Sequence, residues 1–221
     1  MINLSRKVLK QIHRECKEAM MKFIVAFKVA AFIAAFFSVN NAIAQASKSG
    51  KILIVYLTRT NNTKAMSEII HKHLGGKLVA LELVKPYPED YQTTVDQVAK
   101  ENETGFLPKL KTKIDSIEKY DNVFIGFPTW GMQLPPPMKS FLNDYDLSGK
   151  TVIPFNTNAG YGVGTSFETV QSLCQKCKVV EGFSIEGGKE RDGKYLVIKD
   201  DKRIEADKEV EGWLRKLKLL N

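Results

Sequence analysis

The feature that most limits the fold is a series of short apolar segments, the first of which is KILIVYL at residues 51–57. Successive side chains of a strand point to opposite faces, so a strand here is apolar on both faces. Burial on both sides is typical of a parallel sheet covered by helices. The other segments predicted to form strands are 77–84, 122–128, 151–157 and 178–185.

Between these segments, apolar residues recur at the three- and four-residue spacing of amphipathic helices. They are Met66, Ile69, Ile70 and Leu74; Met138, Phe141 and Leu142; Phe167, Val170 and Leu173; and Val210, Trp213, Leu214 and Leu217. Five strands with intervening helices predict an α/β fold: a doubly wound five-stranded parallel sheet with helices on both faces.

Two segments disturb this plan. Pro154 falls inside the fourth predicted strand, although a central strand normally excludes proline because it has no N–H for the ladder. We expect a bulge or another local irregularity there. Residues 186–204, EGGKERDGKYLVIKDDKRI, are highly charged around the apolar YLVI. We interpret them as a hairpin-like excursion before the last helix.

The N-terminal region has the features of an export signal. A positively charged start precedes an apolar stretch from Phe23 to Val39, interrupted only by Lys28, and small residues suited to signal peptidase follow. A retained membrane anchor is the alternative, since about 17 apolar residues is near the lower limit for crossing a bilayer. The interrupting lysine and the small residues favour cleavage.

This signal sets the predicted domain boundaries. Residues 1–46 are expected to be removed, and an alternative start at Met20 or Met21 would make the first residues a gene-start error. Residues 47–221 suit one domain with a sizeable core. We expect this domain to be exported to the periplasm or beyond, with no membrane span left after cleavage.

Net charge argues against a nucleic-acid partner. The whole chain carries a formal +8, but residues 1–46 hold seven Lys/Arg and two Asp/Glu, so the predicted mature domain is near +3. A nucleic-acid-binding domain is usually strongly basic with clustered cations. Here the lysines are scattered, which indicates solvated faces.

Two cysteines remain in the predicted mature domain, Cys174 and Cys177 in SLCQKCKVV. In an oxidising compartment this C-x-x-C can close a small structural disulfide; free thiols and a redox-active pair are the alternatives. The pair falls at the end of a predicted helix, where the helix dipole does not stabilise thiolates.

Candidate ligand-binding residues follow three of the predicted strands. Ligands of such sheets bind at the carboxyl ends of the strands, near the point where the winding direction changes. The segments at these ends are TRTNNT (58–63), PTWGMQLPPP (128–137) and NTNAGYGVGTS (156–166). Each is rich in small polar residues, glycine or an aromatic ring.

The first of these loops has the chemistry of a phosphate site. Its threonines offer hydroxyls and its asparagines offer amides, and the helix predicted to begin near Asn62 would present unpaired N–H groups to an anion. Arg59 could add charge from the rim or point to solvent. The alternative is that Asn61 or Asn62 only caps the helix. The G-x-x-x-x-G-K-[ST] motif is absent from the sequence and GYGVG is not G-x-G-x-x-G, which disfavours a P-loop or dinucleotide site.

The other two loops each carry an aromatic ring. Trp130 comes just before Gly131, and Tyr161 lies between Gly160 and Gly162. Two rings at one sheet edge could sandwich a flat heteroaromatic group. The alternative is one core tryptophan and one exposed tyrosine.

These three loops resemble the ligand-binding loops of flavodoxin-like proteins. The segments that carry the resemblance are ILIVYLTRTNNT, VFIGFPTWGMQLPPPMKSFL and LSGKTVIPFNTNAGYGVGTS, in the family's order and at similar spacing. The resemblance extends over about residues 51–187. In the first loop this sequence has Asn61 where the family usually has glycine, and asparagine tolerates left-handed backbone better than most residues.

The resemblance implies FMN as the cofactor. The implied contacts are Thr58, Arg59, Thr60, Asn61, Asn62 and Thr63 with the phosphate; Pro128, Thr129, Trp130 and Gly131 along one side of the isoalloxazine; and Asn158, Ala159, Gly160, Tyr161 and Gly162 at its pyrimidine edge. From the residues themselves we predict no catalytic side chain and no metal site, since a single C-x-x-C without a second pair or a positioned histidine is weak evidence for zinc. The chemistry would be that of the cofactor.

Three functions remain open after this comparison. The leading one is electron transfer by an FMN-binding protein whose partner is another redox protein or a membrane quinone system. The second is an FMN-dependent reductase of the quinone or NAD(P)H type, and the third is a flavodoxin-like binding protein without flavin. We find no general base or nucleophile on the loops, since His71 and His73 fall near the end of the first predicted helix.

Overall fold

The computed structural model describes residues 50–221. The predicted signal peptide, residues 1–46, lies outside the described residues. Within them, four strands form the centre of the sheet: β1 (Ile52–Tyr56), β2 (Lys77–Ala80), β3 (Asn122–Pro128) and β4 (Thr151–Asn158). All neighbouring strands are parallel, in the order β2-β1-β3-β4-β5.

The fifth predicted strand is divided into two short pieces, β5 (Lys178–Val179) and β6 (Phe183–Glu186), and both pair with β4. The break faces the proline predicted to cause an irregularity. β5 pairs with Thr151 and Val152, and β6 begins its pairing at Phe155. Pro154 lies between these positions, so its missing N–H falls where the neighbouring strand is interrupted.

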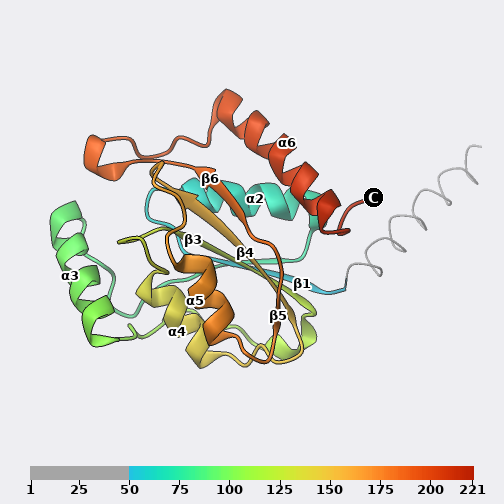
Figure 1. Cartoon of the computed structure of the whole chain (residues 1–221), viewed down its shortest axis with the longest axis horizontal. Coiled ribbons are helices and arrows are strands. Elements are labelled where there is room, and N and C mark those ends of the chain that lie inside the picture. Colours follow the sequence, from blue (N-terminus) through green and yellow to red (C-terminus); the bar gives the residue numbers. More distant parts are fainter. Residues whose placement is uncertain (1–49) are drawn as a thin grey trace, which may run out of the picture. The chain divides into compact units, whose positions relative to one another are not determined.

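Helices cover both faces of the sheet (Figure 1). The side chains of β1 alternate between two apolar clusters, with Ile52 and Ile54 in one and Leu53 and Val55 in the other, as the pleat of a strand requires. The first cluster includes α2 (Asn62–Leu74) and α6 (Asp200–Lys216); the second includes α4 (Pro136–Asp144) and α5 (Ser166–Leu173). The predicted five-stranded, doubly wound arrangement is therefore confirmed.

The sequence patterns did not reveal helix α3 (Tyr91–Thr104). Only Thr94, Val98 and Glu101 are buried in it, so its apolar stripe is short and gives a weak periodic signal. It stands at the edge of the molecule at the left of Figure 1. Its start is fixed by Asp90, whose side chain accepts a hydrogen bond from the Thr93 N–H.

The charged excursion is only partly hairpin-like. A single antiparallel bridge joins Lys189 to Lys194 around the short 3₁₀ helix η2 (Glu190–Asp192), and YLVI is not a strand. The last helix, α6, begins at Asp200, inside the segment predicted to precede it. A second 3₁₀ turn, η1 (Ile117–Lys119), leads into β3. Over residues 50–221, no helix is both long and apolar enough to cross a membrane.

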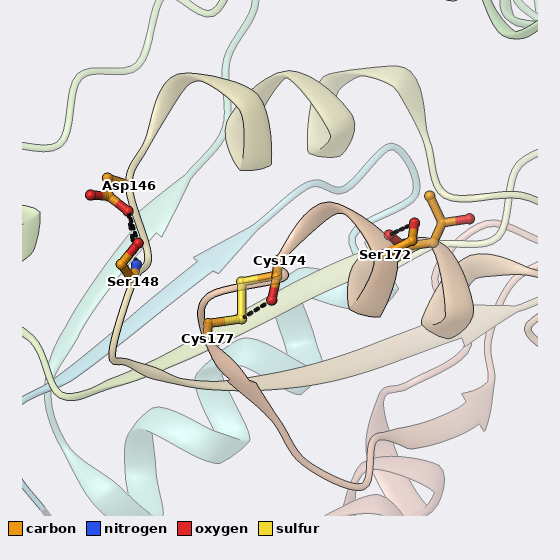
Figure 2. Close-up of a disulfide and its surroundings, with 6 residues drawn as sticks. Asp146, Ser148, Ser172, Cys174 and Cys177 are labelled. Carbon is orange, nitrogen blue, oxygen red and sulfur yellow. Dashed lines mark hydrogen bonds between the residues drawn. A yellow bond between two sulfur atoms is a disulfide. The ribbon is translucent and has the colours of Figure 1, made fainter.

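Cys174 and Cys177 form a disulfide, which is one of the three states considered from the sequence. Figure 2 shows it linking the end of α5 to the chain just before β5. The Gly149 N–H donates to the Lys176 carbonyl at 2.9 Å and so ties this turn to the loop before β4. The disulfide is at the amino end of β5 and lies outside the cleft described below.

Candidate functional site

A cleft of about 650 Å³ opens at the carboxyl ends of β1, β3 and β4. The three predicted loops contribute to it, together with two further walls. One wall is the length of α3, and the other is the strap of residues 188–191, which includes most of η2. The predicted site residues that line the cleft are Arg59, Thr60, Thr63, Pro128, Thr129, Trp130, Gly131, Asn158, Ala159, Tyr161 and Gly162.

The first loop turns at Asn61, the position where flavodoxin-like proteins usually have glycine. Asn61 has φ 64 and ψ 3, the left-handed conformation that glycine adopts easily and asparagine tolerates. Its side chain makes no capping hydrogen bond, and α2 begins at Asn62 as predicted. The first N–H groups of a helix have no intrahelical partner. The helix start at the cleft therefore has the geometry of an anion site.

Three threonines lie on this loop and in the first turn of α2. Thr58 Oγ1 is buried and has no hydrogen-bond partner among the described residues. Thr60 Oγ1 accepts from the Asn62 amide at 2.9 Å, which leaves its own O–H as a donor. The hydroxyls of Thr63 and Thr157 are 2.8 Å apart. A buried hydroxyl normally has a hydrogen-bond partner, and here an anion or a water molecule could supply it.

The Asn62 side chain forms hydrogen bonds with the segment that follows β6. Its Nδ2 donates to the Tyr195 carbonyl at 2.6 Å, and its Oδ1 accepts from the Val197 and Ile198 N–H groups at 2.9 and 3.0 Å. The residue is almost fully buried. Asn62 can therefore offer a ligand its main chain but not its amide.

Arg59 does not extend freely into the cleft. Its Nε lies 2.8 Å from a carboxylate oxygen of Glu190, in the strap. Its other guanidinium nitrogens donate to the carbonyls of Pro88 and Glu89, just before α3. Arg59 thus lines the cleft with its charge paired to Glu190 and does not point freely to solvent.

The second loop is a tight two-residue turn. Trp130 and Gln133 exchange main-chain hydrogen bonds of 3.3 and 3.0 Å around Gly131 and Met132, both of which have positive φ. This is the type I′ pattern, which rarely accepts a residue such as methionine at its second central position. The Met132 carbonyl accepts from the Thr165 N–H at 3.0 Å, and this bond holds the turn against the start of α5.

Trp130 lines the cleft and is half-buried, with its ring packed partly on the core beneath. The ring of Tyr87 meets it edge-on, with centroids 5.3 Å apart. The Tyr87 hydroxyl donates to Glu101 at 2.5 Å. Burial, aided by this carboxylate, raises the pKa of Tyr87 well above its ordinary value. Tyr87 therefore stays protonated and keeps donating.

The third loop is braced from within. Asn158 Oδ1 accepts from the N–H groups of Gly160 and Gly162 at 2.9 and 3.1 Å. Thr129 Oγ1 donates to the Gly162 carbonyl at 3.0 Å and links this loop to the second one. The loop wraps around the asparagine side chain in a way that its glycines allow, since Gly160 and Gly162 have φ values of 87 and 82.

Tyr161 stands at the mouth of the cleft and is 60% exposed. Lys189 Nζ lies 5.3 Å from the centre of its ring, and Arg191 Nη2 approaches its hydroxyl at 3.5 Å. The hydrogen bond and the charge of Lys189, together with the charge of Arg191, lower the pKa of Tyr161. The strap thus brings positive charge to this side of the cleft.

Comparison with known proteins decides the family. The family model for flavodoxins matches residues 51–197. The chain belongs to the flavodoxin family. A flavodoxin from Picosynechococcus sp. (strain PCC 7002) is 25% identical over 187 residues, which cover 76% of this chain and 96% of that protein.

Solved structures have the same fold as this flavodoxin. A presumed flavoprotein from Bacteroides eggerthii DSM 20697 superposes with a TM-score of 0.60 at 28% identity, covering 75% of this chain and 96% of that one. A flavoprotein from Lactobacillus acidophilus NCFM, solved in complex with FMN, has a TM-score of 0.55 at 22% identity and covers 65% and 97% of the two chains. At that identity the second likeness shows the fold alone.

The cleft offers the kinds of groups that a flat ligand carrying a phosphate would need. Thr60 and Thr63 line it at the start of α2, and Trp130 offers a ring on the same cleft. A Cβ added at Gly131 or Gly162 would meet no atom within 4 Å, so the backbone there is open to a ligand. Thr58, Asn61, Asn62 and Gly160 are not part of the cleft lining.

Two walls of the flavodoxin cleft were missed by sequence reasoning. In α3, Tyr91, Val95 and Val98 face the cleft at helical spacing, a signal that was present but short. The strap lies within the segment predicted to be a charged excursion, and charge alone does not indicate that Glu190 meets Arg59. No group of three or more potential metal-ligating side chains occurs in the part of the chain that the structure describes.

Proposed function

We propose that this member of the flavodoxin family binds FMN and transfers electrons to a redox partner. The observation that carries the proposal is the convergence of a helix start, the Thr60 hydroxyl beside it and a tryptophan ring around one cleft. FMN combines a phosphate with a flat ring system. The related fold solved in complex with FMN supports the same ligand.

The phosphate would lie at the start of α2. There the N–H groups of the first helical turn and the helix dipole favour an anion. The Thr60 hydroxyl would donate to its oxygens, whereas the Thr58 hydroxyl, which lacks a partner within residues 50–221, is buried outside the cleft lining. The donors in this set are neutral, because Arg59 is paired with Glu190.

The ring would lie between the second and third loops. Trp130 would stack on one face, and Tyr161 could cover the other from the cleft mouth. The Gly160 and Gly162 N–H groups are already bonded to Asn158, so Ala159 and Tyr161 are the residues whose N–H groups remain for the pyrimidine edge. When bound, FMN supplies one- or two-electron redox chemistry, and the protein supplies its position and its electrostatic surroundings.

The partner that we propose is another redox protein or a membrane quinone system outside the cytoplasm. The disulfide between Cys174 and Cys177 supports an oxidising compartment, because disulfides persist there and are rare in the cytosol. The apolar stretch within residues 1–46 of the sequence supports export. Such a compartment has no pool of NAD(P)H, which favours a carrier that receives electrons from a protein or a quinone.

A second candidate function is an FMN-dependent reductase that acts on a small quinone-like molecule. It is favoured by the apolar side of α3, where Tyr91 and Val95 line the cleft and are more than one-third exposed. A protein partner needs only the flavin edge, whereas an apolar cleft wall suits a small apolar acceptor. Activity with NADH or NADPH and a soluble quinone would distinguish this reductase from a carrier.

The decisive experiment is the colour and flavin content of the purified protein. We expect a yellow protein with flavin absorbance bands that releases FMN on boiling, or a colourless one that becomes yellow with added FMN. Protein that is colourless and does not bind FMN in a fluorescence titration would overturn both flavin functions. The third function considered from the sequence, that of a binding protein without flavin, would then remain.

A further inference from the structure

The Arg59 side chain joins segments from three walls of the cleft. Its Nε donates to both carboxylate oxygens of Glu190, at 2.9 and 2.8 Å. Its Nη1 donates to the Pro88 carbonyl at 2.9 Å and to Thr94 Oγ1 at 3.3 Å, and its Nη2 donates to the Glu89 carbonyl at 2.6 Å. One guanidinium thus connects the first loop, the start of α3 and the strap.

These bonds use almost all of the N–H donors of the Arg59 guanidinium group. Arginine has five N–H donors, of which Nε uses one, Nη1 two and Nη2 one. The side chains of Arg59 and Glu190 are only 19% and 14% exposed. Removal of one member of so shielded a pair leaves the other charge unpaired and poorly solvated. The positive charge is therefore already matched without a ligand.

Both outer walls depend on this contact. α3 buries only three residues, one of which is Thr94, so its start has little apolar packing to hold it. Thr94 Oγ1 donates to the Pro88 carbonyl at 2.9 Å while accepting from Arg59. On the other side, η2 is a single turn without buried residues, and its contact with the first loop runs through Glu190.

We propose that Arg59 is a positioning residue that assembles the cleft from its walls and is not a ligand of the phosphate. Glu190 is its counter-charge, and together they hold α3 and the strap at the distance that the ligand requires. The ligand phosphate is then recognised by the neutral donors at the start of α2. This inference rests on the proposed binding of FMN and assigns Arg59 a different role from the one implied by family resemblance.

The test compares FMN with riboflavin, which lacks the phosphate. We expect Arg59→Gln to weaken both ligands by the same factor, at least fivefold, because the whole cleft loosens. Arg59→Lys should behave like Arg59→Gln, since an ammonium cannot reproduce the forked contacts with Glu190, Pro88 and Glu89. Glu190→Gln should also weaken both ligands equally, because it loosens the strap and does not alter the helix start.

Hydrogen exchange of the flavin-free protein provides a readout that does not require ligand. In Arg59→Gln, amide exchange should increase at least tenfold at the start of α3 and in residues 188–192. The matched control is Arg203→Gln, which removes a guanidinium that pairs with Glu68 at 3.0 Å and lies outside the cleft lining. It should leave both affinities and these exchange rates unchanged.

A selective loss would overturn the inference. If Arg59→Gln weakens FMN tenfold or more while riboflavin and the exchange rates stay the same, and Arg59→Lys restores FMN binding, then Arg59 is a phosphate ligand. If the wild-type protein binds neither flavin, the proposed function fails, and the exchange comparison still decides whether Arg59 holds the walls. Unchanged exchange in Arg59→Gln, Arg59→Lys and Glu190→Gln would refute the positioning role.

Discussion

The hydroxyl oxygens of Thr63 and Thr157 are 2.8 Å apart and share a hydrogen bond in the floor of the cleft. Thr63 belongs to the first turn of α2, and Thr157 is near the end of β4. Both residues are almost fully buried. This bond fixes the helix start, where we place the phosphate, relative to the strand that leads into the third loop.

Removing one of these hydroxyls should destabilise the fold. Thr157→Val keeps the shape of the side chain but leaves the buried Thr63 hydroxyl without this partner, so we expect a loss of about 1–3 kcal/mol in the free energy of unfolding. Urea denaturation would measure it. Thr151→Val, on the same strand, is the control, since the Thr151 side chain has no hydrogen bond among those found in the described residues. Equal effects of the two substitutions would argue against the bond.

Replacing the stacking ring should weaken flavin binding. Trp130→Leu removes the aromatic surface and the edge-on contact with Tyr87. Aromatic pairs contribute about 0.5–1.5 kcal/mol beyond buried area, so FMN affinity should fall by up to roughly tenfold. Fluorescence titration with FMN would show it, with Tyr195→Ala, an exposed residue outside the cleft lining, as the control. An unchanged affinity would place the flavin ring elsewhere.

The centre of the sheet should not accept a methyl group at Gly126. A Cβ there would lie 2.1 Å from Phe155 Cζ, which is fully buried. Overpacking of this kind costs about 1–3 kcal/mol, so Gly126→Ala should lower the thermal midpoint. Gly212→Ala is the matched control, because Gly212 lies in α6 with no atom within 4 Å of the added Cβ. That change should stabilise the protein by about 0.5–1 kcal/mol.

Acid should weaken the contact between α2 and α6. Asp207 receives hydrogen bonds from Lys72 and His73 at 2.7 and 2.8 Å, and that of Lys72 is the main cause of its lowered pKa. A lowered carboxyl pKa stabilises the fold at pH values above the unfolded pKa of about 3.9, and this contribution disappears as pH falls through the folded pKa.

This sign can be checked by denaturation at several pH values. Asp207→Asn should lower the urea midpoint at pH 7, and the difference from wild type should shrink as the pH falls below the unfolded pKa of about 3.9. Asp115→Asn, an exposed residue with no ion pair among those found in the described residues, is the control and should have little effect. A difference that grows on acidification would contradict the assignment.

The fold could be predicted because its strands carry strong local signals. β1 is apolar on both faces, and its burial pattern follows directly from that. The length of the fifth strand could not be predicted, since residues 178–185 contain enough apolar residues for one strand, and only its neighbour β4 shows why it breaks. α3 was missed because most of its surface is exposed, and polar helices give little periodic signal.

The candidate site was predicted where it depends on topology. Parallel strands bring their carboxyl ends to one edge, so the three loops had to meet there. Side-chain partners could not be predicted in the same way. Arg59 meets Glu190 across 131 residues, and Asn62 meets Ile198 across 136. Local sequence patterns do not indicate which distant residue such a side chain will contact.

The break opposite Pro154 also affects how copies of this protein meet. An outer strand with exposed N–H and C=O groups is a template for pairing with another chain, and natural proteins often protect such edges by keeping them short. Here that edge of the sheet is made of two pieces with two and four residues, and at the other edge β2 has four. A strand from another copy would therefore find only a short edge with which to form hydrogen bonds. This disfavours edge-to-edge aggregation of the folded protein.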